Sequence, residues 1–293
     1  MAITISASMV KELRERTGAG MMECKKALVE TRGDMDAAID FLRKSGQAKA
    51  DKKSSRLAAD GRVVIVTDGK RAVMAEVNSE TDFVAKDENF VTFAEAVARC
   101  ALDNRVPDLD ALMSTKLADG RTVESARTEL VAKVGENISL RRFASIEASE
   151  HLGSYTHGAR IGALVSLRGG SEELARDIAM HVAAINPAWL DESSVPDEAL
   201  ERERAIYSEQ ARDSGKPPEI VEKMVAGRVA KYLKEITLLG QPFVKDSDVT
   251  VGKLLKSAGS EVTQILRFEV GEGIEKKQEN FAEEVMAQIN RSA

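Results

Sequence analysis

Residues 61–77 have the sequence GRVVIVTDGKRAVMAEV, and this stretch decides the fold class. Two runs rich in β-branched and small apolar residues, Val63 to Val66 and Ala72 to Val77, flank a turn at Asp68-Gly69. This pattern is typical of a β-hairpin. A helical pattern follows from about Asn89 to Ala101, so this region has the order strand, turn, strand, helix.

The same order of elements recurs further along the chain. Strand patterns at Ser154 to His157 and at Ile161 to Leu167 flank a turn at Gly158, and a helical pattern over Glu172 to Ala184 follows. We interpret this recurrence as an internal duplication. The alternative is one continuous mixed sheet.

Two strand patterns remain outside these units. They cover Ile138 to Ile146 and Thr263 to Val270, and each of them would complete one small antiparallel sheet. The sequence therefore predicts an α+β protein whose core consists of two α+β halves.

The N-terminal region predicts a compact domain of three helices. The helices cover Met9 to Arg16, Met21 to Thr31 and a third segment that Asp34 caps and Ser45-Gly46 ends. Residues 47–56, QAKADKKSSR, lack large apolar side chains, so we expect a flexible basic tether there. Residues 1–56 carry 12 Lys or Arg against 8 Asp or Glu in a chain of net charge −6, which favours a separate module.

A pair of helices is predicted within the second half of the core. Pro196 lies at a first-turn position before a helix that ends near Ala211, and a turn with Pro217-Pro218 leads into a helix that ends near Leu233. Such an antiparallel hairpin protrudes and offers a surface for a partner or for a dimer, as the core also does. Most such hairpins are structural.

The C-terminal residues complete the predicted domain organisation. Phe281, Val285 and Ile289 recur on one helical face, which would dock on the core or on a partner. The predicted boundaries are 1–56 for the N-terminal domain with its tether, 57–140 for the first half of the core, 141–275 for the second half with the hairpin at about 196–235, and 276–293 for a C-terminal helical module.

Composition argues against several classes of protein. No apolar run approaches the roughly 18 to 20 residues that span a bilayer, and the N-terminus lacks the pattern of a signal peptide, so we expect a cytoplasmic protein. Cys24 and Cys100 are the only cysteines, which favours two reduced thiols over a disulfide or a zinc site. The negative net charge makes nucleic acid an unlikely partner.

Recognisable catalytic motifs are absent from the sequence. His151, His157 and His181 have no metal-ligand spacing, and His181 fits a hydrogen-bonded structural residue within a helix. Gly153 to Arg160 has two glycines at the spacing of a phosphate loop, but Ala-Arg stands where Lys-Ser or Lys-Thr is required. We therefore predict no cofactor, no metal site and no direct nucleotide binding.

Two long segments resemble the signature motifs of the elongation factor Ts family. Residues 13–28 have the sequence LRERTGAGMMECKKAL, and residues 76–86 have the sequence EVNSETDFVAK. Shorter similarities follow in family order at residues 134–138, 157–160, 240–244 and 267–273, so the resemblance covers nearly the whole chain.

This resemblance implies both an architecture and an activity. The architecture is a ubiquitin-associated-like N-terminal domain, a core of two α+β subdomains, a helical protrusion and a C-terminal module. The activity is guanine-nucleotide exchange on elongation factor Tu, a GTPase, with Asp82 and Phe83 as a wedge near the Mg²⁺ and phosphate site of the partner. The residues that the resemblance assigns to the wedge are Thr81, Asp82, Phe83 and Val84, and those that it assigns to other partner contacts are Arg14, Met21, Met22, Val134, Gly135, Glu136, Asn137 and His157.

Each of these roles has a competing interpretation. Phe83 would also fit a core residue that closes the hairpin onto its helix, and we expect one of Met21 and Met22 to pack inside the N-terminal domain. A nucleic-acid-binding protein is a rival function, but no strand interleaves aromatic and basic residues. An enzyme that uses Asp82 and Asp87 is another, but the sequence shows no partner residues that would shift their pKa values.

Overall fold

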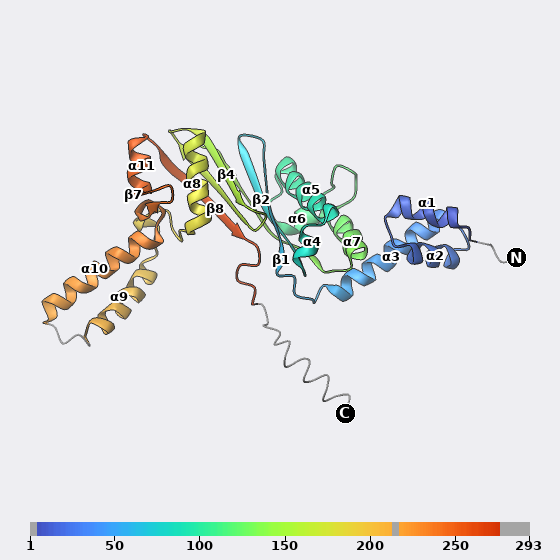
Figure 1. Cartoon of the computed structure of the whole chain (residues 1–293), viewed down its shortest axis with the longest axis horizontal. Helices are drawn as coiled ribbons and strands as arrows, with labels where there is room; N and C mark the ends of the chain where they lie inside the picture. The colour runs from blue at the N-terminus through green and yellow to red at the C-terminus, as the bar shows by residue number, and fades with distance from the viewer. Residues whose placement is uncertain (1–4, 213–216, 276–293) are drawn as a thin grey trace, which may run out of the picture.

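The computed structural model describes residues 5–212 and 217–275, and Figure 1 shows an elongated molecule. Three helices lie at one end, two sheets with their covering helices lie in the middle, and a pair of helices lies at the other end. Among the helices of these two ranges, none has the length and apolar character needed to cross a membrane. The predicted C-terminal helical module at 276–293 lies outside the described residues.

The three N-terminal helices are α1 (Ala7–Thr17), α2 (Met21–Glu30) and α3 (Met35–Lys53). Ser6 caps α1 by accepting a hydrogen bond from the backbone N–H of Met9, and Asp34 caps α3 by accepting one from Ala37. Their small shared core consists of Val10, Leu13, Cys24, Ala27, Leu28 and Ala38.

Helix α3 continues through the segment that we expected to be a flexible tether, so that expectation is wrong. The helix ends at Lys53 instead of Ser45-Gly46, and Gly46 and Ala50 on one of its faces are buried. An added Cβ atom at Gly46 would lie 3.6 Å from the Cβ atom of Ala132 in helix α7, within ordinary contact distance. Because the residues on this face are small, α3 can approach α7 closely and bury the face. The absence of large apolar side chains therefore did not indicate a flexible tether.

The first sheet has the strand order β1-β2-β3 and is antiparallel throughout. Its strands are β1 (Asp60–Thr67), β2 (Arg71–Ser79) and β3 (Ile138–Glu147). One face packs on helix α5 (Glu88–Asn104), and α5 in turn packs with α6 (Leu109–Ser114) and α7 (Val123–Val134). The short helix α4 (Asp82–Ala85) directly follows the hairpin of β1 and β2.

The second sheet has the strand order β4-β5-β8 and is also antiparallel. Its elements are β4 (His151–His157), β5 (Ile161–Arg168) and β8 (Glu261–Glu269), with α8 (Glu172–Ile185) and α11 (Val251–Ser257) on one face. A two-stranded ladder of β6 (Pro242–Phe243) and β7 (Asp246–Thr250) precedes α11. The two predicted extra strands therefore each complete one sheet, and the alternative of one continuous sheet is wrong.

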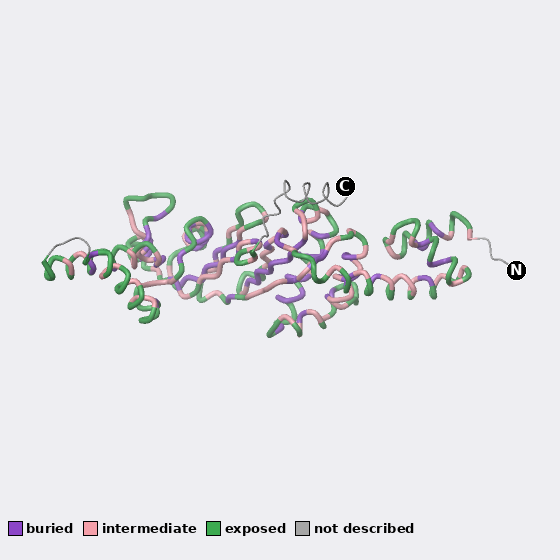
Figure 2. Tube along the Cα trace, turned by 90° about the horizontal axis from the view of Figure 1, so that it is seen from below, coloured by how far each residue is buried: buried purple, intermediate pink, exposed green. Residues whose placement is uncertain are grey.

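The two sheets pack face to face, which buries their central strands on both sides. Along β2, Val73, Ala75 and Val77 face the helices, while Ala72 and Met74 face the second sheet. The layer between the sheets also contains Val63, Ile146, Leu164, Phe268 and Val270. Figure 2 shows many of the buried residues in the middle of the molecule, where Figure 1 places the two sheets.

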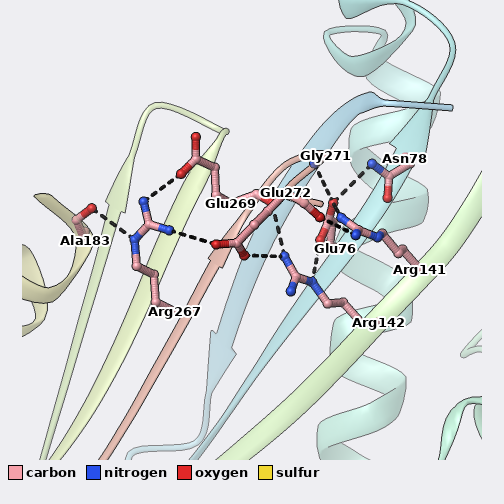
Figure 3. A network of polar contacts seen from close by, with 9 residues as sticks. All are labelled: Glu76, Asn78, Arg141, Arg142, Ala183, Arg267, Glu269, Gly271 and Glu272. Carbon is pink, nitrogen blue, oxygen red and sulfur yellow. Dashed lines mark hydrogen bonds and ion pairs between the residues drawn. The ribbon is translucent and has the colours of Figure 1, made fainter. Parts of the chain in front are cut away.

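A buried ion-pair network ties the end of β8 to the first sheet (Figure 3). The Glu76 carboxylate accepts hydrogen bonds from Arg142 Nε at 2.6 Å, Arg141 Nη1 at 3.0 Å and the backbone N–H of Gly271 at 2.8 Å. Arg142 also lies over the Phe268 ring, 4.2 Å from its centroid. The network therefore joins β2 and β3 to the turn that follows β8.

The pair of helices at the far end consists of α9 (Asp197–Arg212) and α10 (Pro218–Ile236), which pack along each other. The buried residues between them are Ala211, Val225 and Val229. A short 3₁₀ helix (Glu192–Ser194) precedes α9, and a second one (Leu238–Gly240) follows α10. The backbone N–H of Leu238 donates to Trp189 O at 2.8 Å, which fastens the base of the pair to the core.

Candidate functional site

Helix α4 begins at a tightly bonded threonine. Thr81 is its N-cap, and its Oγ1 accepts a hydrogen bond from the backbone N–H of Val84 at 3.4 Å. The Thr81 carbonyl oxygen accepts one from Ser79 Oγ at 2.8 Å. The chain thus turns directly from strand β2 into α4.

The side chains of α4 point in two directions. Ala85 is buried in the core of the first sheet, and Val84 packs against that core. Asp82 forms an ion pair with Lys86, with 2.6 Å between Oδ2 and Nζ. Phe83 points outward, and 81% of its surface is exposed. The interpretation of Phe83 as a core residue is therefore wrong, because its neighbours Val84 and Ala85 supply the inward contacts of the helix.

The turn between α7 and β3 holds the start of α4 through a glutamate. Glu136 Oε2 accepts a hydrogen bond from Thr81 N at 3.0 Å, and Glu136 Oε1 accepts one from Thr81 Oγ1 at 2.7 Å. In return, Glu80 Oε1 accepts one from Asn137 N at 2.6 Å. The fold thus brings together two groups of predicted site residues, Thr81 to Val84 and Val134 to Asn137, that are far apart in the sequence.

The end of α3 contacts this same turn. Asn137 Nδ2 donates to Arg56 O at 2.8 Å, and Lys53 Nζ donates to the carbonyl oxygen of Gly135. Arg56 also pairs with Glu80 at 3.4 Å. The connection from the N-terminal helices to the core therefore ends beside α4.

The other predicted site residues lie elsewhere on the surface. Arg14 on α1 is exposed, and both Met21 and Met22 on α2 are exposed, at 58% and 76%. We expected one methionine to pack internally, and this is wrong because α2 buries Cys24, Ala27 and Leu28 while its first turn stays outside. His157 is exposed at the end of β4 on the second sheet, where the Tyr155 hydroxyl is its neighbour at 3.4 Å.

The two carboxylates considered as an acid–base pair both have lowered pKa values. A hydrogen bond from Lys86 is the main cause for Asp82, and a hydrogen bond from the Asn89 side chain is the main cause for Asp87. Asp87 also caps α5 by accepting from the backbone N–H groups of Asn89 and Phe90. Both groups are therefore ionised near neutral pH, which does not suit a general acid.

His181 and the two cysteines have the structural roles that we expected. His181 is fully buried, with Nε2 at 2.9 Å from Gln241 Oε1 and Nδ1 accepting from Val244 N at 3.2 Å. Burial lowers its pKa against the opposing hydrogen bond to Gln241. Cys24 and Cys100 are both buried and free.

A cleft beside the N-terminal helices does not include Phe83 among its lining residues. It has a volume of about 1090 Å³ and lies between the N-terminal helices and α7, with Lys26, Lys49 and Arg121 among its lining residues. The candidate site is thus an exposed aromatic side chain on a fixed short helix, an arrangement that suits insertion into another protein.

One residue that links the two groups of predicted site residues had no signal of its own in the sequence. Glu80 lies within the second motif, but nothing there indicates that it bonds the backbone of Asn137. The only clue is that an acidic residue stands next to a polar one in both segments, Glu80-Thr81 and Glu136-Asn137.

Comparison with known proteins gives one consistent result. The family model described as elongation factor TS matches residues 80–272. The elongation factor Ts of Thioalkalivibrio sulfidiphilus is 62% identical over 290 residues, which cover 98% of this chain and 99% of the relative. The proteins of the same name from Alkalilimnicola ehrlichii and Legionella pneumophila are 58% and 57% identical over 293 and 288 residues, which cover 99% and 98% of this chain and 100% and 99% of the relatives.

Proposed function

This chain belongs to the elongation factor Ts family, and from that premise we propose that it promotes GDP release from elongation factor Tu by inserting Phe83 beside the nucleotide site. The family is that of the guanine-nucleotide exchange factors of translation elongation, which act by binding another protein. We propose that this binding takes place in the cytoplasm and without covalent chemistry.

The exposure of Phe83 is the observation that carries this proposal. Phe83 leaves 81% of its surface in water, so a partner that covers the ring would gain free energy from burying it. Phe83 stands on helix α4, which is anchored at one end by the buried Ala85 and at the other end by its N-cap, Thr81. The side chain is therefore both available to a partner and held in a defined direction.

Exchange requires that the factor bind more tightly to its partner when the nucleotide site is distorted. The two ligands of the partner, nucleotide and exchange factor, then weaken each other's binding by the same factor. Burial of an aromatic side chain of about 150 to 250 Å² provides at most roughly 4 to 6 kcal/mol. Since about 1.4 kcal/mol corresponds to a tenfold change, half of that energy spent on distortion accelerates release by orders of magnitude.

Charge around Phe83 supports a role beside the Mg²⁺ site of the partner. Asp82 is ionised near neutral pH, and the hydrogen bond from Lys86 lowers its pKa further. An ionised carboxylate next to the inserted ring can compete for the N–H and cationic groups that hold the phosphates. We propose that Thr81 and Val84 mainly support this pair from the two ends of the turn.

The experiment that tests the proposal measures release of a fluorescent GDP analogue from elongation factor Tu. The intact protein should accelerate release strongly, and Phe83→Ala should reduce this acceleration at least about tenfold, as expected for the central aromatic anchor of an interface. Ile185→Ala provides a matched control, because Ile185 is also an exposed apolar residue, at 45%, but lies on α8 of the second sheet. No acceleration by the intact protein would exclude the exchange function, and an unchanged rate with Phe83→Ala alone would exclude the wedge.

A further inference from the structure

We propose that Glu136 is a positioning residue for exchange, whose carboxylate fixes the cap of α4 so that Phe83 is held in the direction of insertion. The inference rests on the proposed function and adds a residue that acts on the partner through Thr81. It gives Glu136 a different role from a partner contact, because both of its carboxylate oxygens are already used within the chain.

Helix α4 is too short to determine its own direction. It has four residues, and an isolated helical turn is unstable because nucleation costs more than one hydrogen bond returns. Its orientation must therefore come from its ends. At the C-terminal end, the buried Ala85 provides an anchor, and Arg62 Nη1 from β1 donates to Ala85 O at 3.4 Å.

At the N-terminal end, Glu136 completes the bonding of Thr81. The backbone N–H and the hydroxyl of Thr81 both donate to Glu136, at 3.0 and 2.7 Å. Because the hydroxyl proton points to Glu136, a lone pair of Oγ1 remains to accept from Val84 N at 3.4 Å. The carboxylate thus determines which way the capping hydroxyl is oriented, and hydrogen bonds to an ionised acceptor are roughly twice as strong as neutral ones.

Glu136 itself lies on a rigid turn. Gly135 ends α7 in the left-handed conformation, with φ of 83° and its N–H donating to Val131 O at 3.0 Å, which is the usual glycine cap of a helix. On the other side, the backbone N–H of Asn137 is held by Glu80 at 2.6 Å. The residue therefore has a fixed backbone on both sides, as a supporting residue requires.

The end of α3 also contacts the turn that contains Glu136, and these contacts help to hold the turn in place. Lys53 donates to Gly135 O, and Asn137 Nδ2 donates to Arg56 O at 2.8 Å. The N-terminal helices and α4 are thus bonded to adjacent residues of one turn. Loosening Glu136 releases α4 while it leaves these α3 contacts in place.

The test separates positioning from binding through the dependence of GDP release on factor concentration. Glu136→Ala should lower the rate at saturating factor at least about tenfold, because displacement of a working group by about 1 Å typically costs one to two orders of magnitude. The concentration that gives half of this rate should change less than about threefold, since the remaining contact surface is intact. Glu136→Gln retains one acceptor oxygen, so its rate at saturating factor should lie between those of the intact protein and of Glu136→Ala.

A second readout follows the support directly. Amide hydrogen exchange at Thr81 and Val84 should become faster in Glu136→Ala, while the amides of β2 keep their protection. Glu129→Gln is the matched control, because Glu129 is a carboxylate of α7 that pairs with Arg121 and makes no bond to Thr81. This control should leave the rate at saturating factor, the half-saturating concentration and the Thr81 exchange unchanged.

Two results would overturn the proposal, and both differ from failure of the exchange function. One is a saturating rate for Glu136→Ala equal to that of the intact protein. This result counts only where the intact protein accelerates release and Phe83→Ala does not. The other is a raised half-saturating concentration with an unchanged saturating rate, which would make Glu136 a contact residue. If the intact protein itself fails to accelerate release, the proposed function is wrong.

Discussion

Gly162 of β5 lies directly against Met74 of β2, and a Cβ atom added to the glycine would come within 2.6 Å of the methionine Sδ. The same atom would also come within 2.6 Å of Val63 Cγ1. At this contact the absence of a side chain on Gly162 lets the two sheets approach each other closely. Met74 and Val63 are both buried, so neither can swing away into solvent.

We therefore expect Gly162→Ala to destabilise the protein. Overpacking of a filled core typically costs about 1 to 3 kcal/mol, and the cost should appear in the free energy of unfolding measured with urea. Gly227→Ala is the control, because Gly227 lies exposed in α10 with no atom near an added Cβ. That control should be neutral or stabilising by up to about 1 kcal/mol, since alanine favours a helix. Equal stability of the two variants would contradict the tight contact.

Glu76 should make the protein sensitive to acid. Burial alone would raise its pKa, but the hydrogen bonds from Gly271, Arg141 and Arg142 outweigh burial and hold the pKa below the ordinary value of 4.5. A carboxylate with a lowered pKa in the folded state contributes stability above about pH 4.5, and this contribution is lost as the pH falls through the folded value. Glu76→Gln should flatten that part of the curve of unfolding free energy against pH, relative to the unaltered chain.

Removal of the Glu76 carboxylate should cost stability at neutral pH as well. Glu76→Ala leaves two arginines without their shared acceptor, which typically costs about 3 to 5 kcal/mol when the pair is buried. We expect a value near the lower end, because Arg141 and Arg142 are 27% and 30% exposed and water can reach them. Urea unfolding at pH 7 measures this loss, and a change below about 0.5 kcal/mol would show that the network contributes little.

The strands of the two three-stranded sheets were predictable from the sequence because apolar runs beside turn residues carry a local signal, whereas β6 and β7 were not predicted. The hairpin of β1 and β2 and its counterpart of β4 and β5 both turn at a glycine, and β1 is rich in β-branched residues. That β3 and β8 would join different sheets followed from their positions after each unit. The end of α3 was not predictable by the same rule, because Gly46 and Ala50 bury a helix face without any large side chain.

The candidate site was predictable in its residues but not in its contacts. The motif around Phe83 could be recognised from its sequence, whereas its exposure depends on how α4 is rotated. That rotation is set by Glu136, which lies far from Thr81 in the sequence, and a contact between distant segments leaves no periodicity to detect. The family resemblance thus points to these residues as a candidate site, while their geometry depends on the tertiary fold.

Two phenylalanines close together in sequence should separate folding from function. Phe90 on α5 is fully buried, and Phe83 is 81% exposed. Phe90→Ala should cost about 3 to 5 kcal/mol of unfolding free energy through the cavity that it creates. Phe83→Ala should change that free energy by less than about 0.5 kcal/mol, as is usual for exposed sites. Thermal or urea unfolding measures both, and a marked loss with Phe83→Ala would mean that the ring packs on its own chain.

His181 should add a second dependence on pH, at less acidic values. Burial lowers its pKa below the ordinary 6.5, against the opposing hydrogen bond to Gln241, and the Phe243 ring lies beside it at 6.0 Å. Because Val244 N–H donates to Nδ1, the proton of the neutral ring is on Nε2 and points to Gln241.

The unfolded chain takes up a proton on His181 below about pH 6.5, whereas the folded chain resists this protonation, so stability is lost as the pH falls from that value. The slope from this residue is at most about 1.4 kcal/mol per pH unit. Urea unfolding between about pH 7 and 5 should therefore show a smaller slope for His181→Gln than for the unaltered chain, and equal slopes would mean that the buried ring takes up its proton as readily as an exposed one.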